Sequence, residues 1–96
     1  SVMLGKLITE TEKEMQAVKD AERWKDLQEL DTLIHHLRSS WEILRADQPL
    51  RKLYVLLHDE DTPNWEAIHN AVKTVSDMGL MIIAMAKEER KKYNNG

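Results

Sequence analysis

Two adjacent histidines, His35 and His36, are the side chains of this chain best suited to nucleophilic chemistry. At roughly 100° per residue they flank an apolar helical stripe on opposite sides, so we expect both imidazoles to reach water. A neutral imidazole is a nucleophile at cell pH and can accept a phosphoryl group. The stripe follows steps of three or four residues: Leu27, Leu30, Ile34, Leu37, Trp41 and Leu44.

The residues one helical turn further on distinguish the two histidines. Arg38 and Ser39 follow His35, which places a cation and a small side chain beside its ring. A guanidinium can pair with phosphoryl oxygens, and a small neighbour leaves room for a bulky donor. His36 meets Ser39 and Ser40 instead, without a cation. The spacing favours His35 as a phosphoryl acceptor, and two polar residues on a solvated face are the alternative.

Length and composition limit the class of protein. The chain has 96 residues, 42% of them hydrophobic and 32% charged, which suits one domain with one modest core. A net charge of -3 argues against nucleic-acid binding by the domain as a whole. The absence of Cys excludes disulfides and thiolate metal sites and suits a reducing cytoplasm. No apolar run approaches the ~20 residues of a membrane span, so we expect no membrane contact.

Four helical segments position these side chains. The first covers 2–20, and its stripe loses phase near 19–22, which predicts a break there. The second covers 22–46 and the third 49–58. The last covers 63–93, with Thr62 as its cap and Pro63 at its first position. Short connections between four helices predict an all-α fold, an antiparallel up-and-down four-helix bundle.

The last helix is apolar nearly all round between Met78 and Met85. We expect this part to be enclosed by the other helices or by a partner. Methionines could also form an adaptable binding surface, but a core filled by Met78, Met81 and Met85 is the favoured interpretation.

The segment around His35 resembles the phosphorylation helix of histidine-containing phosphotransfer (HPt) domains. That family's pattern, His-x-Leu-Lys-Gly/Ser-Ser, is matched by His35, Leu37, Arg38, Ser39 and Ser40, with Arg in place of Lys. An Asp about nine residues before the His and the Leu-rich third helix also follow the family's order. The sequence departs from the pattern at Trp41, at Arg45 in place of a frequent Gly, and in its reduced N-terminal helix.

The resemblance implies a function for residues 1–96 as a single HPt-like domain, which the clipped ends suggest was excised from a longer hybrid sensor kinase. His35 would accept a phosphoryl group from an aspartate of a receiver domain and pass it to another receiver. Arg38 and Ser39 would support the phosphoryl group. Thr32 and His36 would belong to the docking face, with Glu12 or Met15 of the first helix as neighbours.

The same resemblance implies response-regulator receivers as partners, no cofactor of the domain's own, a monomer in isolation and no kinase activity. The main alternative is a non-catalytic helical adaptor. Two further patterns receive little weight. Glu66 and His69 form the Glu-x-x-His unit of di-metal bundles, but no second unit accompanies them, so no metal site is expected. Arg51 and His58 only weakly resemble the spacing of HEPN-type ribonucleases.

Overall fold

The computed structural model describes residues 2–59 and 63–94, and within them the chain is helical without any β-strand. Four helices follow one another: α1 (Val2–Arg23), α2 (Leu27–Ile43), α3 (Gln48–Leu57) and α4 (Trp65–Asn94). The predicted all-α class is confirmed for these residues.

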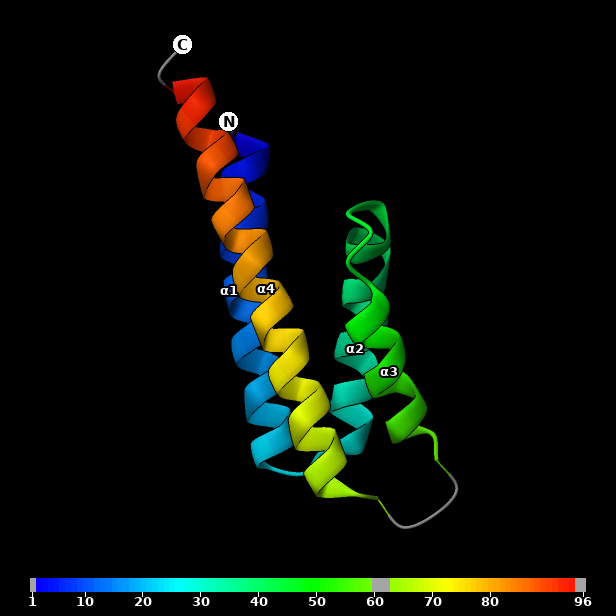
Figure 1. Cartoon of the computed structure of the whole chain (residues 1–96). Helices are drawn as coiled ribbons and strands as arrows, with labels where there is room; N and C mark the ends of the chain where they lie inside the picture. The colour runs from blue at the N-terminus through cyan, green and yellow to red at the C-terminus, as the bar shows by residue number, and fades with distance from the viewer. Residues whose placement is uncertain (1, 60–62, 95–96) are drawn as a thin grey trace.

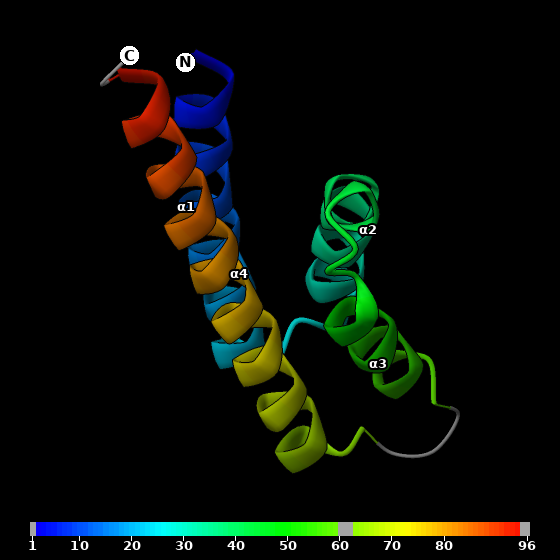
Figure 2. The same ribbon diagram turned by 45° about the horizontal axis from the view of Figure 1, so that its top comes forward.

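The helices associate as a long pair and a short pair (Figure 1). α1 and α4 lie side by side, and α2 and α3 form the second pair. α1 also contacts α2, and α3 also contacts α4. Two views show the pairs meeting near the α1–α2 connection and diverging toward the end where α1 begins and α4 ends (Figures 1 and 2). The result is an elongated body of 53 × 23 × 18 Å.

The predicted stripes form most of the core, except that Leu44, at the end of the second stripe, is 38% exposed. α2 contributes Leu30, Ile34, Leu37 and Trp41, each at most 2% exposed. The other helices bury the predicted positions Ile8, Thr11, Met15, Val18, Leu50, Leu53, Ile68, Val72, Val75, Ile82 and Ala86. The main cluster draws on all four helices, whereas a second, small cluster around Ile8 and Ile83 joins only α1 and α4.

The predicted break between the first two helices is confirmed, but it lies at 24–26 instead of 19–22, because Ala21 continues the stripe and α1 ends at Arg23. Lys25 then adopts a left-handed conformation with φ 55°. The N–H of Asp26 donates to the carbonyl of Ala21 over 2.9 Å, and that of Lys25 donates to Glu22 over 3.0 Å. This is the Schellman pattern of a helix end. The Asp26 carboxylate caps α2 by accepting from the Glu29 N–H at 3.0 Å.

The same device ends α2. Arg45 has φ 57°. The N–H of Ala46 donates to the Trp41 carbonyl over 2.8 Å, and the N–H of Arg45 donates to the Glu42 carbonyl over 3.0 Å. Arg45 therefore occupies the position at which glycine is the least strained residue.

The beginning of α4 also differs from the prediction. The helix begins at Trp65 rather than Pro63, because Asn64 is its cap. The Asn64 side-chain oxygen accepts from the Ala67 N–H at 3.1 Å, and the Asn64 carbonyl accepts from the Ile68 N–H at 2.9 Å. Thr62, the predicted cap, lies outside the described residues.

The expectation that Met81 and Met85 fill the core is wrong. They are 59% and 54% exposed, and Leu80 is 61% exposed, so the other described helices do not enclose this part of α4. α3 has only 10 residues against 30 in α4, and the α2–α3 pair diverges from it. Met78, by contrast, is partly buried and packs against the main cluster, and Met15 is buried at Gly79, where an added Cβ would overlap its Sδ and Cγ. None of the described helices has the length and apolar character needed to cross a bilayer.

The left-handed position of Arg45 generates a stability prediction. Arg45→Gly is expected to raise the free energy of unfolding by about 0.5–1 kcal/mol, because glycine adopts positive φ without the steric cost of a Cβ. Urea titration measures the change. Arg45→Ala is the matched control, since it removes the charge and keeps the Cβ. Equal stability of the two variants would contradict the assignment of strain to this residue.

Candidate functional site

His35 and His36 lie on opposite flanks of α2, and the predicted exposure of both is confirmed, with side chains 55% and 75% exposed. His36 faces α1, where its Nε2 lies 3.8 Å from Glu14 Oε2. His35 faces α3, where its ring meets the ring of Tyr54 edge-on at a centroid distance of 6.0 Å. The two neighbouring histidines therefore have different environments.

Three side chains, from α2, α3 and the C-cap of α3, form a cluster with His35. Asp31 Oδ1 lies 2.9 Å from His58 Nε2 and 3.5 Å from His35 Nε2. Tyr54 contacts both histidines, since its ring also packs on that of His58 at 4.2 Å with a tilt of 35°. Asp31, His35, Tyr54 and His58 thus form a closed cycle of contacts. The cycle restricts the orientation of an imidazole that is otherwise exposed.

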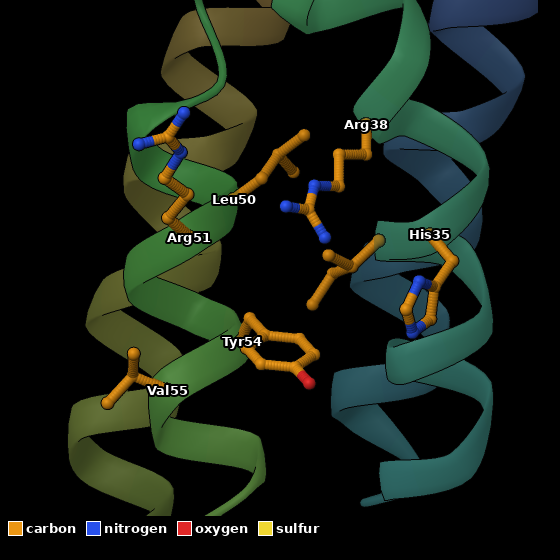
Figure 3. Close-up of a pocket in the computed structure, with 7 residues that line it drawn as sticks. His35, Arg38, Leu50, Arg51, Tyr54 and Val55 are labelled. Carbon is orange, nitrogen blue, oxygen red and sulfur yellow. The ribbon is translucent and has the colours of Figure 1, made fainter.

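His35 borders a groove of about 330 Å³ between α2 and α3 (Figure 3). Arg38 extends from α2 into this space, and Tyr54 reaches across it from α3. Apolar side chains form most of the remaining wall. The complete lining is Ile34, His35, Arg38, Leu50, Arg51, Tyr54 and Val55.

Both arginines of the groove hold a carboxylate through Nε. Arg38 Nε lies 2.9 Å from Glu42 Oε1, and Arg51 Nε lies 2.8 Å from Asp47 Oδ2. Their side chains are 51% and 69% exposed. A guanidinium has five N–H donors, so the terminal nitrogens can bind a further anion while Nε keeps its partner.

The other predicted site residues lie away from the groove. Ser39 is exposed on α2, and the Thr32 hydroxyl donates to the Gln28 carbonyl at 3.0 Å. Neither residue lines the groove. Met15, an expected neighbour of the docking face, is only 6% exposed and belongs to the core, so that expectation is wrong. Glu12 is exposed, but the α1 carboxylate beside His36 is Glu14.

Sequence reasoning missed Asp31, Tyr54 and His58 as neighbours of His35. Asp31 precedes His35 by one helical turn, a spacing that already places the two side chains together. Tyr54 and His58, the C-cap of α3, are likewise one turn apart, but only the packing of α3 on α2 shows that they lie near His35. The HEPN-like pair is divided between two partners, because Arg51 binds Asp47 and His58 binds Asp31.

His69 has a separate partner. Its Nδ1 lies 2.6 Å from Glu22 Oε1 of α1, so the α4 histidine of the Glu-x-x-His pattern pairs with α1 rather than with Glu66. Over the described ranges 2–59 and 63–94, no group of three or more His, Asp or Glu side chains, the cluster at Asp31 included, is arranged so that it could hold a metal ion.

Comparisons with protein-family models, with curated proteins and with solved structures give no match to this chain. What the site can do chemically therefore follows from its own side chains. They combine an exposed imidazole, two guanidiniums and an apolar groove.

Glu14, beside His36, has a perturbed carboxyl group. Burial raises its pKa above 4.5, an effect that His36 opposes and Glu10 reinforces. As pH rises above 4.5, the unfolded chain releases this proton while the folded protein still holds it. The stability contributed by protonated Glu14 is therefore lost as pH increases through its raised pKa.

The predicted loss of stability with rising pH can be tested in a His36→Gln background, which removes the ion pair between His36 and Glu14. Adding Glu14→Gln should raise stability at neutral pH, by less than about 1 kcal/mol since the carboxyl remains partly hydrated. The gain should shrink as pH falls toward 4.5, because Glu14 itself then becomes neutral. Urea titrations across pH measure it, with Glu12→Gln on the same helix as control. A gain that does not depend on pH would contradict the burial of Glu14.

Proposed function

We propose that this chain is a histidine phosphotransfer module of a multistep phosphorelay, with His35 as the phosphoryl acceptor. The observation that carries the proposal is the position of His35. It is an exposed imidazole at the margin of a groove that also presents Arg38. The match to the HPt pattern at His35, Leu37, Arg38, Ser39 and Ser40 gives this geometry its interpretation.

The proposed transfer is a displacement at phosphorus. A lone pair on a ring nitrogen of neutral His35 attacks the phosphorus of an aspartyl phosphate, and a nitrogen–phosphorus bond forms. The bond from phosphorus to the aspartyl oxygen breaks, and its electron pair leaves with the carboxylate. The second ring nitrogen keeps its proton, and Asp31 is the carboxylate that can accept a hydrogen bond from the charged ring. Arg38 supports the phosphoryl oxygens, and the receiver supplies its own magnesium ion.

The proposal extends to the architecture and setting of the domain. We propose that the four helices form an antiparallel up-and-down bundle, that the isolated domain is a monomer, and that it works in the cytoplasm. Ser39 would keep the approach to the ring open, since it is small and lies one turn from His35.

A second candidate, a non-catalytic adaptor, is favoured by one observation. Leu80, Met81 and Met85 expose apolar surface along α4, which a partner protein could cover. An adaptor would bind through this surface and would carry no phosphoryl group.

Labelling of the purified chain tests the proposal. Phosphorylated receiver domains and the small donor phosphoramidate should each add one phosphoryl group, stable to base and labile to acid. His35→Gln should reduce labelling to background. Arg38→Gln should slow it about tenfold, the equivalent of one charge-assisted hydrogen bond. Intact-mass measurement and peptide mapping locate the group.

His36→Gln is the matched control, because it alters the neighbouring exposed imidazole and should leave labelling unchanged. Label that persists in His35→Gln and disappears in His36→Gln would move the site to the α1 flank. No label from either donor would favour the adaptor.

A further inference from the structure

We propose that a receiver docks on the α3 side of His35, in the groove between α2 and α3, with an apolar side chain in the groove and carboxylates on Arg38 and Arg51. This inference rests on the proposed function and assigns its docking surface. The sequence alone placed that surface on the exposed side of α2, around Thr32, His35 and Arg38, with neighbours from the first helix.

The walls of the groove favour an apolar side chain of the partner. Ile34 and Leu50 are each 1% exposed and belong to the core, so the base of the groove is fixed by packing. Val55 and Tyr54 are 67% and 38% exposed on its α3 side. A rigid base with exposed apolar walls is the form of a pocket that receives an anchoring side chain of a partner. The volume of about 330 Å³ is sufficient for one such side chain.

Two guanidiniums give the groove positive charge. Arg38 and Arg51 belong to different helices and both line the groove. Their exposed terminal nitrogens can bind carboxylates, and a receiver that holds an acyl phosphate among magnesium-binding carboxylates presents a negative surface. Charge complementarity and the apolar anchor therefore favour the same occupant.

The α1 side offers less to such a partner. Carboxylates lie on both sides, Glu14 on the α1 side and Glu42 and Asp47 on the α3 side, but the latter two are each paired with an arginine of the groove. Docking over α3 instead brings the acyl phosphate to the edge of the groove that His35 borders.

The test compares two donors on the full chain. Phosphoramidate transfers its phosphoryl group as its nitrogen–phosphorus bond breaks and ammonia leaves, and it needs no docking surface. A panel of purified receiver domains, phosphorylated on aspartate, needs one. The rate from receivers divided by the rate from phosphoramidate therefore isolates docking from the chemistry of His35.

Val55→Asp and Arg51→Gln should each lower this ratio about tenfold, the loss of one anchoring contact. Met81→Asp is the matched control for Val55→Asp, because Met81 is 59% exposed on α4 and outside the groove. Lys52→Gln is the control for Arg51→Gln, since Lys52 is the exposed neighbour that does not line the groove. Circular dichroism verifies that every variant is folded.

Three results would overturn the inference. An unchanged ratio in Val55→Asp and Arg51→Gln, with a reduced ratio in His36→Asp, would place docking on the α1 side. A dimer in sedimentation experiments that Val55→Asp dissociates would identify a second copy of the chain as the occupant. A chain that no receiver labels, although phosphoramidate labels His35, would remove the receiver as partner. Absence of label from both donors is different, since it refutes the proposed function itself.

Discussion

Burial of one face of α2 constrains the whole site. Leu30, Ile34, Leu37 and Trp41 are almost completely removed from water, and any rotation of α2 about its axis would expose one edge of this stripe. That rotation angle decides where the neighbouring histidines point. With the stripe facing the core, His35 turns toward α3 and His36 toward α1. The proposed preference for His35 over His36 as phosphoryl acceptor is thus a consequence of core packing in which neither histidine takes part.

The side chains around His35 already satisfy one another before any phosphoryl group arrives. Asp31 binds His58, and Arg38 binds Glu42. These are exposed pairs, each of small energy, so a dianionic group can recruit Arg38 at little cost. The carboxylate of Asp31 lies beside two imidazoles, those of His35 and His58. Its negative charge is therefore shared between the two rings and does not act on His35 alone. Arg38 and Asp31 can therefore form hydrogen bonds with new partners while the helices keep their positions.

The sequence predicted burial and exposure correctly where these depend mainly on helical periodicity. Stripes with a helical period identified the buried positions from Ile8 to Ala86, together with the exposure of His35 and His36. The helix ends were harder, because the left-handed positions are occupied by Lys25 and Arg45 instead of the glycine that usually marks them. Met81 and Met85 were misassigned because their burial depends on how far α2 and α3 extend along α4. The contact of Tyr54 with His35 depends on helix–helix packing, which has no local signature.

The unequal lengths of the helices have a consequence for motion. At about 1.5 Å per residue, α4 extends far beyond α3. The part beyond α3 is held mainly by the small cluster of Ile8, Ile83 and Ala86 on α1 and α4. Local opening should therefore cost least at that end and most beside α2, so amide hydrogens along α4 should exchange on a graded scale. The chain combines a rigid base that orients the imidazole with a two-helix extension that can open without disturbing it.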